Sequence, residues 1–246
     1  MALIEEFEKS GNWLFTWRSY LPLLVMALYV LGMWQEGYAP LEEPFDDAWG
    51  LVCLGVGLIG LGIRAVTIGR TPRGTSGRNT DGQIAESLNT TGIYSVVRHP
   101  LYLGNFIMGL GLSLYARVWW LTLIYTLVFW LYYERIMFAE EAFLRRKFGD
   151  AYLKWSETTP AFIPSPRRWT RSDLPFSMRN VLKREYNGFF ALVLTLVILH
   201  VIGRLIAGHA FWIDRMWQIL LAASFLIWIT LRTLKKKSSL LQVEGR

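Results

Sequence analysis

Residues 101–134 read "LYLGNFIMGLGLSLYARVWWLTLIYTLVFWLYYE" and form the longest nearly uninterrupted apolar stretch of the sequence. It holds two apolar runs, 101–116 and 118–134, and only the tip Tyr115-Ala116-Arg117 separates them. An apolar run approaching ~20 residues is typical of a helix that crosses a bilayer. The stretch therefore predicts a tight helical hairpin whose two ends lie on the same side of a membrane.

Four further apolar segments lie outside the hairpin, at 19–35, 49–68, 187–203 and 212–231. Charged residues make up 18% of the 246-residue chain, whereas soluble proteins carry roughly 25%. The 12 Trp and 11 Tyr are typical of membrane interfaces, where both residue types gather. Several of the six segments are shorter than the ~20 residues that span a bilayer comfortably. We nevertheless expect an all-α integral membrane protein with about six transmembrane helices.

The charges of the loops predict the orientation. The loop 36–47 carries acidic residues and no Lys or Arg, whereas 69–98, 135–186 and the tail from Arg232 are rich in basic residues. Lys and Arg gather in cytoplasmic loops. Six crossings with both termini in the cytoplasm satisfy this rule and explain the net charge of +7. We expect the protein to lie in a bacterial inner membrane. No pattern in the sequence indicates nucleic-acid binding.

Cysteine and histidine give little support to a metal site. Cys53 is the only cysteine, which excludes an intramolecular disulfide and a Cys-rich zinc site. His99, His200 and His209 are too scattered to indicate metal binding. We interpret His200 and His209 as structural or interfacial, and Asp214-Arg215 as an interfacial ion pair.

Two regions show how the helices continue and pack. The segment 49–68 has glycines at 50, 55, 57, 60 and 62, which predicts close helix packing in a membrane. Beyond the hairpin, we expect the helix to continue to Lys147 and a short helix to follow over 150–157. Prolines at 160, 164 and 166 then indicate an extended segment.

The first polar motif is "GIYSVVRHPLYLGN", residues 92–105. Pro100 suits the first position of a helix, so Arg98 and His99 lie at its mouth, where the positive end of the helix favours anions. Gly104 and Asn105 follow one turn later and would let a polar ligand approach. The alternative is that Arg98 extends to lipid phosphates and His99 merely caps the helix.

The second polar motif is "AEEAFLRRKFGDAYLKW", residues 139–155. It places Glu140 and Glu141 at the end of a long apolar helix. The two carboxylates are candidates for ligand binding. Alternatively, they only solvate the helix end, or pair with Arg145 one turn later.

Together, in this order and with the hairpin between them, the two motifs resemble the isoprenylcysteine carboxyl methyltransferase family and its phospholipid methyltransferase relatives. The resemblance covers about residues 90–165. The matching residues are Gly92, Tyr94, Arg98, His99, Pro100, Tyr102, Gly104, Glu140, Glu141, Leu144, Phe148, Gly149, Tyr152, Pro160 and Pro164.

The resemblance implies a membrane methyltransferase that uses S-adenosyl-L-methionine, bound in a cytoplasmic cofactor-binding segment. Arg98 would lie near the methyl group and its acceptor, and we expect Arg98 and Glu141 to be the catalytic residues. Only an amine acceptor would need a base, for which Glu140 and Glu141 are the nearby candidates. The residues expected to bind the cofactor are Tyr94, His99, Pro100, Tyr102, Gly104, Asn105, Glu140 and Glu141.

The loop 68–83 departs from the family because it is rich in glycine and arginine. Either it obeys the positive-inside bias, or its arginines clamp an anionic head group, since guanidinium groups suit phosphate oxygens. The candidate substrate-binding residues are Arg64, Arg70, Arg73 and Arg78.

This loop and the two additional helices make the chain most similar to bacterial lipid A phosphate methyltransferases. We therefore expect a membrane lipid as partner and no obligate protein partner. Isoprenylcysteine and phosphatidylethanolamine remain alternative acceptors.

Membrane sterol reductases share a related Arg-His-Pro-x-Tyr pattern but use NADPH, and they form a second functional hypothesis. A non-enzymatic membrane module or transporter is a third. The chain divides into N-terminal helices with the arginine-rich loop (1–86), a methyltransferase core (87–186) and a C-terminal helix pair with a basic tail (187–246).

Overall fold

The computed structural model describes residues 2–18, 20–41, 45–72, 74–75 and 83–246. It is helical: the described residues form eight α-helices, two 3₁₀ turns and a single isolated bridge between Gly92 and Thr170. The α-helices are α1 (Leu3–Trp17), α2 (Leu21–Glu36), α3 (Phe45–Gly69), α4 (Pro100–Tyr115), α5 (Trp119–Phe148), α6 (Asp150–Thr158), α7 (Met178–Ile206) and α8 (Arg215–Lys237).

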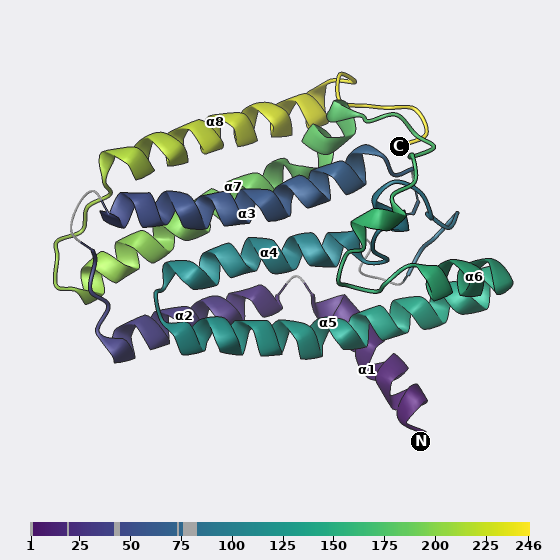
Figure 1. Ribbon diagram of the computed structural model, residues 1–246. Helices are drawn as coiled ribbons and strands as arrows, with labels where there is room; N and C mark the ends of the chain where they lie inside the picture. The colour runs from purple at the N-terminus through teal and green to yellow at the C-terminus, as the bar shows by residue number, and fades with distance from the viewer. Residues whose placement is uncertain (1, 19, 42–44, 73, 76–82) are drawn as a thin grey trace.

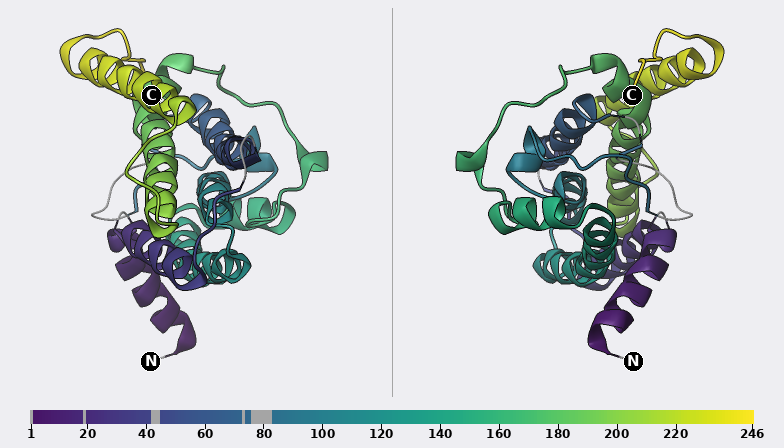
Figure 2. Two further views of the ribbon diagram at one scale, coloured as in Figure 1. Left: turned by 90° about the vertical axis from the view of Figure 1, so that its left-hand side faces the viewer. Right: turned by 90° about the vertical axis from the view of Figure 1, so that its right-hand side faces the viewer.

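Six helices lie side by side and alternate in direction: α2, α3, α4, α5, α7 and α8 (Figure 1). Both termini, α1 and α6 lie at one end of this bundle, and the α4–α5 tip lies at the other. Viewed along the helices, α8 forms one edge and the segment from α6 to α7 loops out to one side (Figure 2). The predicted hairpin is confirmed as α4 and α5.

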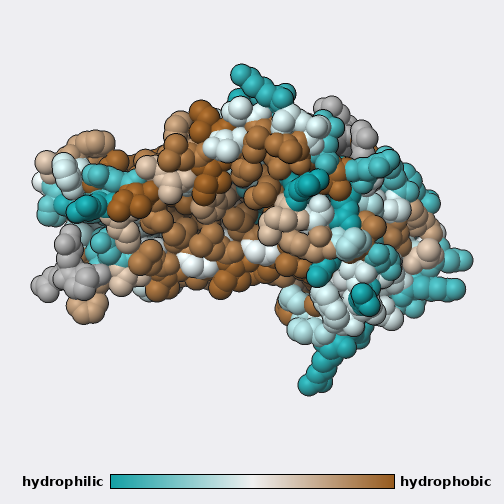
Figure 3. Space-filling model, turned by 90° about the horizontal axis from the view of Figure 1, so that it is seen from above, coloured by the Kyte–Doolittle hydropathy of each residue, from teal (hydrophilic) through white to brown (hydrophobic). Residues whose placement is uncertain are grey.

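Each of the six predicted apolar segments contains a helix, but these helices differ in length. By length and composition, α3, α5, α7 and α8 can each cross a membrane. Helices α2 and α4 have 16 residues each. At 1.5 Å per residue, α4 is shorter than a hydrocarbon core of ~30 Å. Apolar side chains cover the middle of the bundle face seen in Figure 3, and polar side chains gather toward its two ends.

Glycines allow α3 and α4 to pack closely, as their spacing predicts. A Cβ on Gly60 would lie 2.5 Å from the carbonyl oxygen of Gly104, and one on Gly111 would lie 2.5 Å from the carbonyl oxygen of Cys53. Gly55 and Gly62, in contrast, face open space. Only part of the glycine pattern therefore serves the contact with α4.

Helix α1 was not among the predicted elements. It lies against α5, where a Cβ on Gly11 would be only 2.1 Å from the carbonyl oxygen of Arg135. The Tyr132 hydroxyl donates a hydrogen bond to the carbonyl oxygen of Leu14. The mixture of acidic and apolar residues in α1 gives no long apolar run, which is why a search for such runs missed it.

The predicted break after α5 is confirmed. Gly149 ends the helix with a φ of +52°, a conformation that favours glycine, and α6 begins at Asp150. The extended segment after α6 returns to the start of α4. There the Arg98 N–H donates to the carbonyl oxygen of Pro160 (2.9 Å) and the Ser165 N–H donates to that of Val96 (3.0 Å). This segment therefore fixes the backbone of the first polar motif.

At the opposite end of the bundle, Asp214 does not pair with Arg215 as predicted. Its carboxylate instead lies 2.8 Å from both the Arg204 guanidinium and the His200 ring. The other ring nitrogen of His200 hydrogen-bonds with the Tyr115 hydroxyl (2.9 Å). Because His200 is buried within these contacts, its role here is structural, and the contacts tie α7, the α7–α8 loop and the hairpin tip together.

Candidate active site

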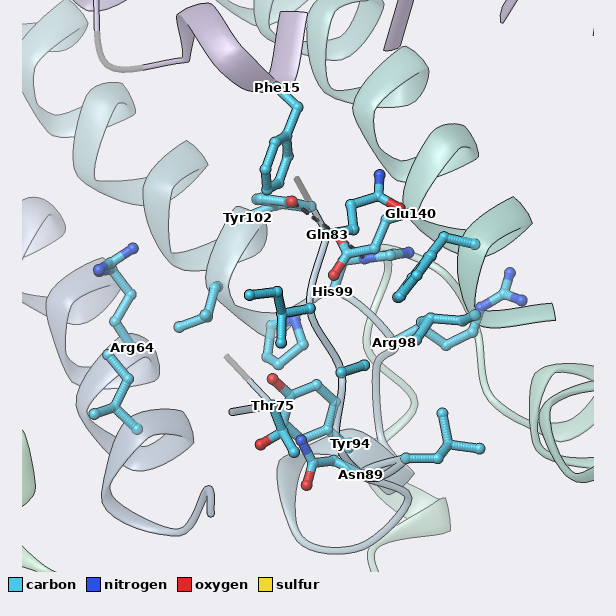
Figure 4. Close-up of a pocket in the computed structure, with 18 of the residues that line it drawn as sticks. Phe15, Arg64, Thr75, Gln83, Asn89, Tyr94, Arg98, His99, Tyr102 and Glu140 are labelled. Carbon is cyan, nitrogen blue, oxygen red and sulfur yellow. Dashed lines mark hydrogen bonds and ion pairs between the residues drawn. The ribbon is translucent and has the colours of Figure 1, made fainter. Parts of the chain in front are cut away.

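A cavity of about 290 Å³ lies at the end of the bundle that carries both termini. Helices α1, α3, α4, α5, α6 and α7 and the segment 83–99 contribute to its lining. In Figure 4, Arg64 lies on one side, and His99, Glu140 and Arg98 lie on the other. The two sides carry different polar groups.

One side is built where the start of α4 meets the last turns of α5. Pro100 occupies the first position of α4, and the buried His99 precedes it. His99 Nε2 lies 2.9 Å from Glu141 Oε1, and its Nδ1 lies 3.7 Å from Glu140 Oε2. The Tyr102 hydroxyl donates to Glu140 Oε2 at 2.9 Å, and its ring stacks on that of His99. The two polar motifs are therefore joined by direct contacts.

Arg98 stands beside this pair. Its Nη1 lies 3.3 Å from Glu141 Oε2, so Glu141 contacts both Arg98 and His99. Burial, reinforced by the Glu141 charge, raises the pKa of the nearby Tyr152 hydroxyl above its ordinary value, so this group stays protonated. Glu141 itself is not part of the cavity lining, whereas Arg98 and Glu140 are.

The other side of the cavity is a network centred on Arg64 of α3. Its Nε and Nη2 donate to the two oxygens of Glu185 on α7, at 2.8 and 2.7 Å. Its Nη1 donates to Oδ1 of Asn105 on α4 at 2.6 Å, and the Asn105 amide donates to the Tyr133 hydroxyl of α5 at 3.3 Å. The network thus connects four helices.

The structure brings most of the sequence-predicted site residues to this cavity. Those that line it are Arg64, Tyr94, Arg98, His99, Pro100, Tyr102, Asn105 and Glu140. Gly104 lies instead in the α3–α4 contact, where an added Cβ would meet the Arg64 side chain and the carbonyl oxygen of Gly60.

The arginine-rich loop does not gather at the cavity as a unit. Arg70 lies elsewhere, with its guanidinium over the rings of Trp169 and Phe176. Arg73 and Arg78 lie outside the described residues. Of the four predicted substrate-binding arginines, Arg64 is the one that the structure places in the lining.

Sequence reasoning missed the contributions of α1 and α7. Phe15 of α1, Arg18 directly after α1, and Arg184 and Glu185 of α7 all line the cavity. The signal for Glu185 was an acidic residue close to the start of the apolar run 187–203. Phe15 and Arg18 could not be found without the position of α1.

The charges of the lining favour an anionic ligand. The lining contains the guanidinium groups of Arg18, Arg64, Arg98 and Arg184, and the carboxylates of Glu140 and Glu185. Glu185 pairs with Arg64, and Arg98 lies 3.3 Å from Glu141, which stands beside the lining. Guanidinium groups suit the oxygens of an anionic ligand.

Comparison with known proteins supports the resemblance seen in the motifs. Residues 49–151 match the model of the phospholipid methyltransferase family. The resemblance is confirmed over this central segment. This segment includes most of α3, the hairpin, the first polar motif and most of the second, so most of the cavity lining lies in it. Phe15, Arg18, Trp155, Arg184 and Glu185 lie outside it.

Individual relatives match the chain over part of their length. The chain is 40% identical to the protein-S-isoprenylcysteine O-methyltransferase of Schizosaccharomyces pombe over 77 residues, which are 31% of this chain and 33% of that protein. It is 32% identical to the nickel-cobalt-cadmium resistance protein NccN of Alcaligenes xylosoxydans xylosoxydans over 50% of this chain and 55% of NccN.

A third relative is covered more fully. The chain is 28% identical to a probable protein-S-isoprenylcysteine O-methyltransferase of Oryza sativa subsp. indica, over 58% of this chain and 78% of that protein. No solved structure matches the chain. The chain thus spans a third to about half the length of the first two relatives.

Proposed function

We propose that this protein is an integral-membrane methyltransferase that transfers a methyl group from S-adenosyl-L-methionine to the anionic head group of a membrane lipid. One observation carries the proposal: the two polar motifs, 42 residues apart at His99 and Glu141, meet at one cavity through direct side-chain contacts. The family match over residues 49–151 supports the reaction class.

The residues on the His99 side fit the proposed cofactor. Its sulfonium is a cation, and the Glu140 carboxylate and the rings of Tyr94 and Tyr102 are groups that stabilise cations. Its amino-acid carboxylate would suit the positive start of α4. When bound, the cofactor supplies an activated methyl group. The volume of about 290 Å³ is near the lower end of small-molecule sites.

The protein's own part in the reaction is to bind, orient and exclude water. An anionic acceptor oxygen needs no general base, because it is already a nucleophile at neutral pH. Arg98 would orient this oxygen toward the methyl group. Correct placement of the reacting atoms can lower the activation barrier by several kcal/mol, about 7 or more in favourable cases. An amine acceptor would need a base. Glu140 is better placed for that role, since Glu141 is occupied by Arg98 and His99.

For the acceptor, our best candidate is a lipid phosphate such as that of lipid A. The arginines of the lining support an anionic head group, although only Arg64 of the predicted clamp lines the cavity. The names of the relatives favour a different acceptor, the carboxyl group of isoprenylcysteine. Phosphatidylethanolamine is a further alternative, and the family description is compatible with it.

The proposal also covers how the chain crosses the membrane and which end faces the cytoplasm. We infer six membrane crossings in a bacterial inner membrane, with both termini and the cavity facing the cytoplasm. Two observations support this: the termini and the cavity lie at the same end of the bundle, and the Lys235-Lys236-Lys237 tail lies at that end too (Figure 1). S-adenosyl-L-methionine would then reach the site directly from the cytoplasm.

Titration calorimetry separates this function from the reductase hypothesis. Purified protein in detergent would be titrated with S-adenosylhomocysteine and, separately, with NADPH. The proposal predicts binding of S-adenosylhomocysteine and no binding of NADPH. Binding of NADPH alone would overturn it in favour of a reductase.

A further inference from the structure

Arg64 faces the cavity from the side opposite His99 and Glu140 (Figure 4), and its partner Glu185 also lines the cavity. Both side chains are well buried, with 18% of Arg64 and 5% of Glu185 exposed. The carboxylate holds the guanidinium through two hydrogen bonds, and Asn105 holds it through a third. The orientation of the Arg64 side chain is thus fixed from two directions.

This arrangement leaves part of the guanidinium available. A guanidinium has five N–H donors. The described residues use three of them, so one N–H on Nη1 and one on Nη2 have no acceptor among those residues. Two N–H groups on one rigid, planar group suit an oxyanion with two oxygens, such as a phosphate or a carboxylate.

Stability alone is a weak explanation for the pair. A buried ion pair often contributes no more to stability than apolar residues of similar size would, because both charges lose their hydration. Charged residues inside apolar helices are costly and mark functional sites. Glu185 lies on α7, outside the segment 49–151 that matches the family model.

We propose that the Arg64–Glu185 pair is the binding site for the acceptor's oxyanion, with Arg64 making the contact and Glu185 acting as its positioning residue. This inference rests on the proposed function and deepens it. It gives the C-terminal helix pair a role, because α7 then supplies one of the residues that determine acceptor specificity. The cofactor side of the cavity does not depend on the pair.

The test compares Glu185→Gln with the charge-swapped double variant Arg64→Glu/Glu185→Arg. Transfer of labelled methyl groups would be measured at increasing concentrations of acceptor in phosphatidylcholine vesicles. One set of vesicles carries lipid A and the other N-acetyl-S-farnesylcysteine, so a phosphate and a carboxylate are compared. Binding of S-adenosylhomocysteine is measured in parallel by calorimetry.

For Glu185→Gln we expect the acceptor KM to rise by roughly tenfold or more, while the affinity for S-adenosylhomocysteine changes less than twofold. The charge-swapped variant keeps an ion pair, so it should fold, yet its acceptor KM should stay raised because the guanidinium has moved to α7. If the swap restores the wild-type KM, the pair is only structural and the inference is wrong.

A matched control lies at the opposite end of the bundle. The Arg117–Asp46 pair is 2.9 Å apart and similarly buried, with 17% and 11% of the side chains exposed. Asp46→Asn should lower thermal stability and leave the acceptor KM unchanged. If Asp46→Asn and Glu185→Gln raise the KM equally, the effect reflects general destabilisation and contradicts the inference.

The outcomes also separate this inference from the proposed function. If the wild-type protein does not bind S-adenosylhomocysteine, the proposed function fails. If it binds S-adenosylhomocysteine but methylates neither acceptor, the oxyanion site is wrong while the methyltransferase assignment stands. If Glu185→Gln weakens cofactor binding instead of raising the acceptor KM, the pair belongs to the cofactor side.

Discussion

At the scale of single residues, the two adjacent glutamates at the end of α5 have different surroundings. Glu140 lines the cavity and accepts a hydrogen bond from Tyr102. Glu141 lies behind it and contacts Arg98 and His99. We therefore expect Glu140 to contact ligand directly and Glu141 to hold Arg98 and His99 in position.

Replacing Glu141 by Gln removes the charge that holds Arg98 and His99. Hydrogen bonds to charged groups contribute about 1.5–3 kcal/mol each, so affinity for S-adenosylhomocysteine should fall about tenfold. Calorimetry on the purified variant measures this. Glu157→Gln, an exposed change on the neighbouring α6, is the control and should bind normally. Equal affinities in both variants would show that Glu141 does not shape the cofactor side.

Replacing Tyr102 by Phe removes the hydroxyl that holds Glu140 and keeps the ring that stacks on His99. A neutral hydrogen bond contributes about 1 kcal/mol, so we expect about fivefold weaker cofactor binding with the fold intact. Tyr115→Phe, which loses a hydrogen bond to His200 at the far end, should leave cofactor binding unchanged. A loss of binding in Tyr115→Phe would contradict this assignment.

The residues of the site were predictable where the motif itself places them together. His99, Pro100 and Tyr102 follow one another on one turn of α4, and the hairpin returns the glutamates to them. Glu185 could not be identified as a partner of Arg64, because the pairing depends on how α7 packs against α3. Arg70 was predicted to bind the substrate. Its position in the sequence gave no sign that its guanidinium would instead lie against the ring of Trp169.

At the scale of helices, the contact between α3 and α4 sets the position of Arg64. Gly60 and Gly104 let the two backbones approach, and Arg64 lies one turn beyond Gly60. The long apolar runs were predictable because burial in lipid demands them. Helix α1 and the early start of α7 at Met178 were not, since their stability comes from contacts with other helices.

Gly60→Ala tests this contact directly. The new methyl group would meet the Gly104 carbonyl oxygen at 2.5 Å, so we expect a loss of about 1–3 kcal/mol in stability and a lower methyl-transfer rate. Gly62→Ala is the matched control, because a Cβ there meets open space. Thermal unfolding in detergent compares the two, and equal midpoints would mean that α3 and α4 are not closely packed.

At the scale of the whole molecule, one end of the bundle carries the cavity, both termini and the basic tail. The other end carries the connections between α2 and α3, between α4 and α5, and between α7 and α8. Single-cysteine labelling can place these ends, because Cys53 is the only cysteine and is buried. In a Cys53→Ala background, Lys154→Cys, Ser239→Cys and Ala210→Cys would each be exposed to a membrane-impermeant maleimide in intact spheroplasts.

We expect only Ala210→Cys to react, since the account places its loop outside and the other two positions in the cytoplasm. All three should react after the membrane is permeabilised. Reaction of Lys154→Cys in intact spheroplasts would reverse the proposed orientation and place the cavity away from the cytoplasmic cofactor.

The central claim is that this protein methylates a membrane lipid, and mass spectrometry of total membrane lipids tests it most directly. Lipids would be extracted from cells that produce the wild-type protein, the Arg98→Ala variant or neither. The account predicts a lipid species heavier by one CH₂ unit with the wild-type protein, and its loss with Arg98→Ala. Identical lipid profiles in all three extracts, with the protein present and folded in the membrane, would contradict the account.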